Sequence, residues 1–148
     1  MNEKQLAEAC VKALNEKAMF ENHLGAKIVA VDAGYAKLVM PVQEFMLNGH
    51  RTCQGGAIFS FADAAFAYAC NGRNVPTVAF ACDITFVKPA FEGDVLTAEG
   101  VEKYLSGRNG IYDIKVSNQK GETIALFVGK SRAVAGSILD EKQLKEIQ

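Results

Sequence analysis

The segment Ala57 to Cys70, AIFSFADAAFAYAC, constrains the fold more than any other part of the chain. It is rich in alanine and contains neither glycine nor proline, so it predicts a helix. Apolar residues lie almost all round that helix, which must therefore be covered on most sides. We expect part of its surface to meet a second subunit. Asn71-Gly72 follows and predicts the end of the helix.

Strand-like runs of β-branched and aromatic residues make up most of the remaining chain. Two of them precede the helix and are joined by the short turn Ala33-Gly34, and Pro41 closes the second. Short turns also separate four runs after the helix, so neighbouring strands should pair antiparallel. The predicted strands are 26–32, 35–42, 77–88, 95–105, 110–118 and 123–134.

These elements predict one α+β domain over residues 1–148, in which a long, curved antiparallel β-sheet wraps around one central helix. Helical spacing of apolar residues predicts a further helix over about 3–20. A polar, glycine-containing stretch, 43–56, predicts a loop that leads into the central helix. The core should span about 21–135, and the tail, about 136–148, should carry a short polar helix or a frayed end.

Composition excludes several classes of protein. The net charge is −1, from 16 basic and 17 acidic residues, and the basic residues are scattered, which argues against nucleic-acid binding. No apolar stretch is long enough to span a bilayer, and the N-terminus lacks a signal-peptide core, so we expect a cytoplasmic protein with no membrane partner. The four cysteines form no C-x-x-C pair, which predicts no metal site. In a reducing compartment we expect them to be free thiols.

Asp63 is the one acidic residue of the central helix, and its neighbours are phenylalanine and alanine. An ionised aspartate in such surroundings needs partners, or its pKa rises. Aspartate is also a poor residue for the middle of a helix. One interpretation is a functional carboxylate. The other is a structural aspartate that accepts backbone hydrogen bonds or faces solvent, and Asp63 alone does not separate the two.

Gly55-Gly56 stands just before the predicted helix, where free N–H groups and the positive end of the helix dipole suit an oxyanion or a polarised carbonyl. The simpler interpretation is that the glycines permit a tight connection between loop and helix. Asn48, His50 and Gln54 lie within eight residues of Gly56 and could position a water or a ligand carbonyl. Asn48-Gly49 is equally a turn dipeptide, and His50 can be a solvated side chain.

Helix geometry separates the two candidate groups. Gly56 and Asp63 are seven residues apart, so they share a face but lie about 10 Å apart along the axis. One small group cannot touch both in the same chain. If both act on one substrate, two antiparallel central helices related by a twofold axis would place Gly56 of one subunit beside Asp63 of the other.

The sequence MLNGHRTCQGGAIFSFADAAFAYACN resembles the signature of hot-dog-fold acyl-CoA thioesterases of the PaaI type, a family linked to phenylacetic acid degradation. The resemblance continues through ITFVKPAFEGDVLTA, GIYDIKVSNQKGETIALF and GKSR, and covers roughly residues 20 to 135. It implies a hot-dog fold, a homodimer or a homotetramer built of two dimers, and an acyl-CoA substrate. It implies no cofactor, since CoA is part of the substrate.

The resemblance also implies roles for individual residues. The family's catalytic acid falls on Asp63, and its helix-start glycine, whose N–H polarises the thioester carbonyl, falls on Gly56 after Gly55. Its asparagine, which helps to hold the attacking water or the carboxylate, falls on Asn48. Gln54 departs from the family's His-Gly-Gly pattern. Glutamine exchanges hydrogen bonds but cannot carry a proton, which points to slower catalysis or a different substrate.

The mechanism implied is hydrolysis of an acyl-CoA thioester on the N–H of Gly56. Asp63 of the other subunit would act as general base on water or attack directly, and the sequence does not separate these routes. Asn48 and Gln54 would orient the water and the carbonyl. Expected substrate-binding residues are Phe59 and Phe66 for the acyl or aryl group, His50 in the loop, and Lys88, Arg108, Lys130 and Arg132 for the nucleotide, although a surface lysine is usually only a solvated charge.

Two other functions are alternatives to hydrolysis. A hot-dog dehydratase acting on 3-hydroxyacyl thioesters generally needs a histidine together with a carboxylate, and residue 54 is glutamine. A non-catalytic acyl-CoA-binding protein would gain nothing from a buried acid at position 63.

Overall fold

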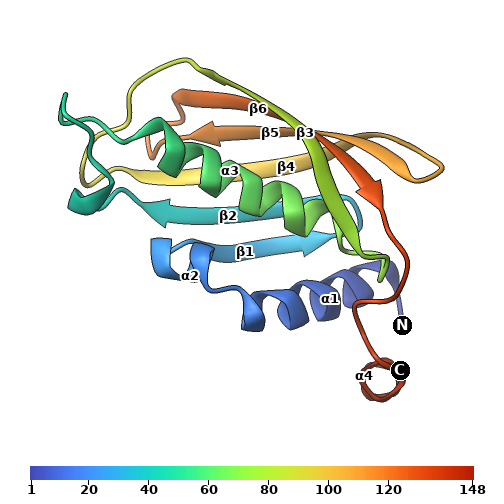
Figure 1. Ribbon diagram of the computed structural model, residues 1–148. Helices are drawn as coiled ribbons and strands as arrows, with labels where there is room; N and C mark the ends of the chain where they lie inside the picture. The colour runs from blue at the N-terminus through green and yellow to red at the C-terminus, as the bar shows by residue number, and fades with distance from the viewer.

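The computed structural model describes all 148 residues. Six antiparallel strands form one sheet, and the helix α3 lies across one face of that sheet (Figure 1). The strand order in the sheet is β1-β2-β4-β5-β6-β3. This confirms the predicted α+β architecture. The elements are α1 Glu3–Lys17, α2 Phe20–Leu24, β1 Lys27–Asp32, β2 Tyr35–Pro41, a 3-10 turn Glu44–Met46, α3 Gly55–Cys70, β3 Thr77–Phe86, β4 Val95–Ser106, β5 Asn109–Ser117, β6 Thr123–Ala133 and α4 Glu141–Glu146.

The N-terminal helix differs from its prediction. It ends at Lys17, and a separate short helix, α2, begins at Phe20. Gly25 ends α2 in the left-handed conformation, with φ of 83°, which an L-residue with a side chain rarely adopts. The sequence pattern merges the two helices because apolar residues continue across the break. None of the helices has the length and apolar character needed to cross a membrane.

The central helix begins two residues earlier than predicted, because Gly55 and Gly56 take up helical backbone rather than ending the loop. Its far end is held by Asn71, whose amide nitrogen donates to the carbonyl oxygens of Ala67 and Thr77 at 2.8 and 3.0 Å. The same side chain accepts from the N–H of Thr77 at 2.9 Å. Asn71 therefore connects the end of α3 to the start of β3.

Small residues let α3 approach the sheet closely. A Cβ atom on Gly129 of β6 would lie 2.7 Å from the ring of Phe66. On Gly100 of β4 it would lie 3.3 Å from the carbonyl oxygen of Ala65. The buried side of α3 accordingly meets the inner face of the sheet without space for larger groups. The largest fully buried residues of this core are Phe61, Phe66, Tyr68, Tyr112, Phe127, Leu38 and Met40.

The two edges of the sheet differ in what covers them. At one edge α1 packs beside β1, as Figure 1 shows. At the other edge β3 pairs with β6 on one side only, and its second side is uncovered. Val78, Phe80 and Phe86 of β3 are each 51% exposed. An uncovered, apolar edge strand is a ready template for pairing with another chain.

Replacing Gly129 with alanine should destabilise the fold. The new methyl group meets the ring of Phe66 inside a filled core, and overpacking of this kind typically costs about 1–3 kcal/mol. Chemical denaturation measures the change. Gly49→Ala is the matched control, because a Cβ there meets nothing within 4 Å, and it should leave the unfolding midpoint unchanged. Equal stability of the two variants would contradict the close packing of α3.

Candidate functional site

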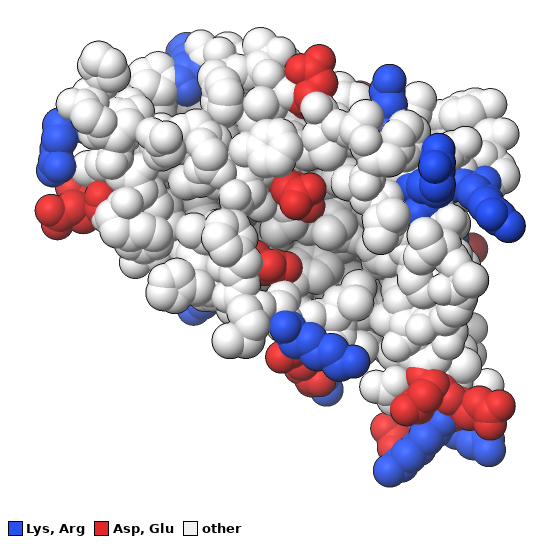
Figure 2. Space-filling view, in the orientation of Figure 1, with Lys and Arg blue, Asp and Glu red and all other residues white.

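One stripe of α3 remains accessible. Gly56 is exposed, and Phe59, Ser60, Asp63 and Ala67 are half-buried; all five lie on about the same side of the helix. Most other residues of the helix are buried. The prediction that Gly56 and Asp63 share a face is thus confirmed. Figure 2 shows this side of the molecule as largely uncharged, with isolated acidic side chains near its centre and basic ones toward its margins.

At the start of the stripe, two backbone N–H groups lack partners. The carbonyl oxygen of Gln54 accepts from the N–H groups of Ala57 and Ile58, at 3.0 and 3.3 Å. The N–H groups of Gly55 and Gly56 donate no hydrogen bond within the chain, and Gln54 provides no side-chain cap. Free N–H groups at the positive end of a 16-residue helix favour an oxyanion or a polarised carbonyl oxygen.

The two glycines differ in what their missing side chains permit. A Cβ on Gly55 would lie 2.9 Å from the Phe86 ring, so packing within the chain accounts for Gly55. A Cβ on Gly56 would meet nothing closer than Gln54, at 4.0 Å, and its φ is not positive. Folding of this chain therefore does not require glycine at position 56. The open space above its N–H is available to a ligand or to another subunit.

Asp63, one helical turn beyond Ser60, has no polar partner. It forms no ion pair and no side-chain hydrogen bond, although it is half-buried. Burial raises the pKa of its carboxyl group, and the nearby carboxylate of Glu21 raises that pKa further. The thiols of Cys70 and Cys82 also lie near it, and burial, together with the charge of Asp63, raises their pKa values. An unpartnered carboxylate of raised pKa suits proton abstraction.

The loop before α3 is stabilised by Asn48. Its side-chain oxygen accepts from the N–H groups of His50 and Thr52, at 2.9 and 3.2 Å, and its side-chain nitrogen donates to the hydroxyl of Thr52 at 3.0 Å. Asn48 thus fixes the loop that leads to Gly56. Gln54 and His50 are both exposed, and neither side chain forms a hydrogen bond within the chain. The structure places none of the three beside Asp63 of the same chain.

Of the two aromatic residues predicted to contact the acyl group, Phe59 is half-buried on the accessible stripe. Phe66 is in the core, 1% exposed, with its ring centroid 5.6 Å from that of Tyr112 and 5.9 Å from that of Phe127. The prediction that Phe66 lines an accessible pocket is therefore wrong. Its ring lies against β5 and β6, where a Cβ on Gly129 would be only 2.7 Å away.

The four basic residues predicted for nucleotide binding do not form one cluster. Lys88 follows β3 at the Gly55 end and pairs with Glu122 at 2.9 Å. Arg108 lies at the opposite end of the sheet, where its carbonyl oxygen accepts from Ala133 N–H. Lys130 and Arg132 alternate with inward-facing residues of β6, so they lie on the outer face of the sheet. There the guanidinium of Arg132 lies 4.9 Å from the ring centroid of Phe80.

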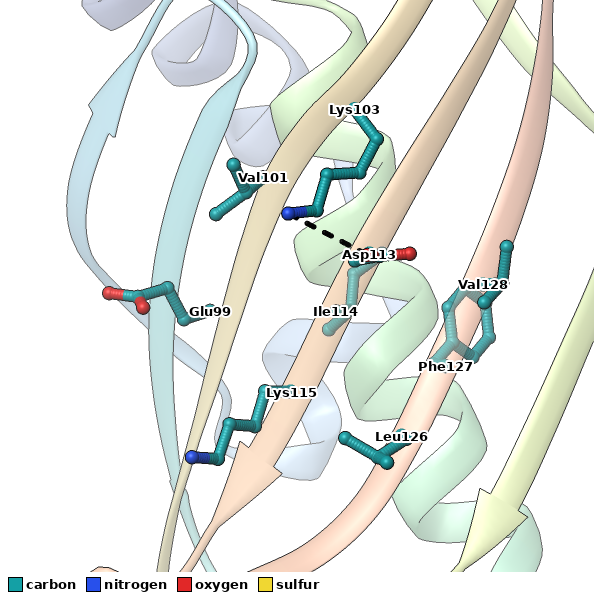
Figure 3. A pocket seen from close by; sticks show the side chains of 9 residues that line it. All are labelled: Glu99, Val101, Lys103, Asp113, Ile114, Lys115, Leu126, Phe127 and Val128. Atoms are coloured by element: carbon teal, nitrogen blue, oxygen red, sulfur yellow. Dashed lines mark ion pairs between the residues drawn. The ribbon is translucent and has the colours of Figure 1, made fainter.

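A groove on the outer face of the sheet lies away from α3. Figure 3 shows its side chains from that face, with the helix behind the strands. Lys103 and Asp113 approach each other across it at 3.9 Å. The sheet separates this groove from Gly56 and Asp63, so it is not part of the stripe. Its lining residues are Glu99, Val101, Lys103, Asp113, Ile114, Lys115, Leu126, Phe127 and Val128.

Comparison with known proteins gives the family. The model of the thioesterase superfamily matches residues 50–125, which include Gly56 and Asp63. The chain is 46% identical over 132 residues to the acyl-coenzyme A thioesterase PaaI of Escherichia coli, covering 86% of this chain and 94% of that protein. The chain belongs to the thioesterase superfamily.

Solved structures agree with this assignment. The E. coli PaaI protein from the phenylacetic acid degradation operon superposes on this thioesterase with a TM-score of 0.91 at 42% identity, covering 92% of this chain and 99% of that one. A mutant of the phenylacetic acid degradation protein PaaI from Thermus thermophilus gives a TM-score of 0.75 at 34% identity, covering 78% of this chain and 98% of that one. The sheet wrapped around α3 is the hot-dog fold that the sequence predicted.

Two features near Asp63 were not predicted from the sequence. Glu21 of α2 reaches the neighbourhood of Asp63, and Tyr68 of α3 donates a hydrogen bond to the Glu21 carboxylate at 2.8 Å. Forty-two positions separate Glu21 from Asp63, so only the fold brings them together.

No three His, Cys, Asp or Glu side chains gather in a way that could hold a metal ion.

Gly56→Ala should fold as well as the wild type. The methyl group enters open space, and alanine in place of helical glycine stabilises by up to about 1 kcal/mol. Gly55→Ala should gain less, because the ring of Phe86 has to move. Thermal unfolding of the two variants measures the difference. A marked loss of stability in Gly56→Ala would show that folding needs this glycine after all.

Asp63→Asn should stabilise the protein at neutral pH. Because the folded state raises the pKa of Asp63, the stability contributed by this group is present below the ordinary aspartate pKa of about 4 and is lost as the pH rises through the folded value. The uncharged amide avoids that loss. Unfolding measured from acid to neutral pH should show the advantage of Asp63→Asn growing with pH. Asp113→Asn, at an exposed position, is the control.

Proposed function

We propose that this protein hydrolyses acyl-CoA thioesters to the free acid and CoA, with Gly56 and Asp63 as the reacting groups. The observation that carries the proposal is the accessible stripe of α3, which combines unpartnered N–H groups at one end with an unpartnered carboxylate of raised pKa. The name of the E. coli relative, an acyl-coenzyme A thioesterase, supports the same substrate class.

In the proposed reaction, the thioester carbonyl oxygen accepts from Gly56 N–H, which stabilises the negative charge that develops there. Asp63 takes a proton from water while the water oxygen bonds to the carbonyl carbon. The carbon–sulfur bond then breaks, and the CoA thiolate leaves and takes up the proton. In the alternative route Asp63 attacks first and forms a mixed anhydride that water hydrolyses. A mass spectrum of the rapidly quenched protein separates the routes, because only the second acylates Asp63.

The two groups would come from different subunits of a homodimer. Along one helix they lie about 10 Å apart, too far to act on one carbonyl carbon. The uncovered edge of β3 lies beside α3, since Phe86 contacts Gly55 and the thiol of Cys82 lies near Asp63. A second copy paired along this edge by a twofold axis would set the two α3 helices antiparallel. Gly56 would then face the partner's Asp63, giving two sites per dimer.

The remaining residues take supporting roles in this proposal. Asn48 fixes the loop, and the exposed Gln54 is free to hydrogen-bond the thioester. Phe59 offers apolar surface to an acyl or aryl group. Lys88 stands two residues beyond Phe86, close to the helix start, and would contact a CoA phosphate there, although it also pairs with Glu122. His50, Arg108, Lys130 and Arg132 remain predictions for the outer part of the substrate.

Thiol release from phenylacetyl-CoA and from medium-chain acyl-CoA substrates tests the activity. Asp63→Asn should lower kcat/KM by at least about a hundredfold, because it removes the base. The wild-type rate should fall in acid at a pH above the ordinary aspartate pKa of about 4. Asp113→Asn should retain the full rate. Tight acyl-CoA binding without turnover in the wild type would identify a binding protein instead.

Mixing two variants that should each be inactive tests the shared site: Asp63→Asn lacks the base, and the side chain of Gly56→Val fills the open space above the N–H that the carbonyl oxygen would occupy. A heterodimer of Asp63→Asn and Gly56→Val chains keeps one intact site and has one site with both defects. After free exchange of subunits, half the dimers are mixed, so about a quarter of the wild-type rate should return. The control mixes Asp63→Asn with the double variant, which cannot form an intact site. No recovery in the first mixture, despite proven exchange, rules out sites shared between subunits.

A further inference from the structure

A small pocket opens at the far end of α3, away from Gly56. It lies where α3 ends, β3 begins, β6 ends and a hairpin turn joins β4 to β5. That hairpin is at the end of the sheet opposite the start of α3 (Figure 1). The volume of the pocket is about 110 Å³, enough for several water-sized groups. Five of its ten lining residues are hydrophobic, and the polar ones include two arginines and a serine.

Ser131 of β6 brings a nearly buried hydroxyl without a partner to this pocket. The residue is 1% exposed, and no side-chain oxygen of the chain is both sealed from solvent and unpartnered. The Ser131 hydroxyl forms no hydrogen bond, so its remaining access must be through the pocket that it lines. Glycine at position 110 leaves this oxygen uncovered, since a Cβ there would lie 2.7 Å from it. A hydroxyl in this position is unfavourable unless a bound group accepts its proton.

Arg73 and Arg108 bring positive charge to the same pocket. Arg108, in the β4–β5 turn, forms no ion pair. Arg73 pairs with Glu102, its two terminal nitrogens donating to the carboxylate oxygens at 2.6 and 3.3 Å. A guanidinium has five N–H groups, so three on Arg73 stay free for a ligand. Two positive charges and one negative charge give this group of side chains a net charge of +1.

The end of α3 acts against an anion, but weakly. The last carbonyl groups of a helix carry partial negative charge. Here the side-chain amide of Asn71 donates to the carbonyl oxygen of Ala67 at 2.8 Å, which offsets part of that charge. The pocket is therefore suited to one added negative charge rather than to two.

We propose that this pocket binds a small organic monocarboxylate, with Arg108 and the free N–H groups of Arg73 on its oxygens and the Ser131 hydroxyl donating to one of them. Its single charge balances the net charge of +1. The hydrophobic half of the lining would contact its hydrocarbon part, which inorganic phosphate lacks. The site is separate from Gly56 and binds whether or not the protein hydrolyses thioesters. Arg108 would thus have a ligand besides the substrate nucleotide for which it is predicted.

Titration of the whole protein with sodium propionate, at constant ionic strength, tests the site. In NMR spectra the backbone amide signals of Gly107 and Ser131 report on the pocket, and the signal of Gly56 reports separately on the start of α3. Propionate should shift the signals of Gly107 and Ser131 until they saturate. Propionamide, which has a similar shape and no charge, should leave them in place.

Two variants remove the proposed contacts. Arg108→Gln removes a charge, and Ser131→Ala removes the hydroxyl. Each should weaken propionate binding about tenfold or more, because a hydrogen bond to a charged group typically contributes that much. Arg132→Gln, on the outer face of β6, is the matched control and should bind propionate as the wild type does. Because Ser131 is buried, circular dichroism checks the folding of its variant, whereas Arg108 is exposed and tests the site without that risk.

Signals of Gly107 and Ser131 that do not move with propionate, or that move equally in Arg108→Gln, would overturn the proposal. Tighter binding of inorganic phosphate than of propionate at the same signals would overturn the assignment of a carboxylate. Thioester hydrolysis is measured separately. A wild type without turnover would contradict the proposed function and leave the propionate result unaffected.

Discussion

The close contact between α3 and the sheet is the constraint on which the rest of the structure depends. Gly129 and Gly100 leave room for the helix, and alanines on its buried side bring the two backbones together. That contact covers most of the helix and leaves one stripe, on which Gly56 and Asp63 lie. The accessible chemistry of the helix is thus a consequence of how its apolar side packs. A helix lying further from the sheet would leave the core poorly filled and the stripe undefined.

Three groups that lack interaction partners lie together on this side of the molecule. Asp63 has no partner, the N–H groups of Gly55 and Gly56 are free, and β3 pairs along only one of its sides. Each disfavours an isolated chain, since half-buried charges and unpaired backbone groups are unfavourable unless something compensates. A second copy along β3 would complete the sheet and bring the free N–H groups to a carboxylate-containing site. That one association would complete the sheet and bring both reacting groups to one substrate is the main structural argument for the proposed dimer.

Much of the fold could be predicted because its determinants are local. Turn signals such as Ala33-Gly34 separate the strands, and the alanine-rich run identifies the helix. Asp63 stands out because its charge contradicts its neighbours. The features that could not be predicted depend on long-range packing. Phe66 looks equivalent to Phe59 in the sequence, but Phe66 is buried in the core and Phe59 is on the stripe. Glu21 gives no local signal, so its approach to Asp63 required the fold.

The uncovered edge of β3 also has a consequence for the newly synthesised chain. Its sequence, TVAFACDITF, contains one charged residue, Asp83, and combines β-branched and aromatic side chains of strong strand propensity. Such segments readily pair with extended strands of other chains, and charged gatekeeper residues normally limit this aggregation. If the proposed dimer forms, aggregation therefore competes most strongly in the interval between folding and pairing with a second copy. A higher chain concentration then acts in both directions, since it speeds the proposed dimerisation and misdirected association alike.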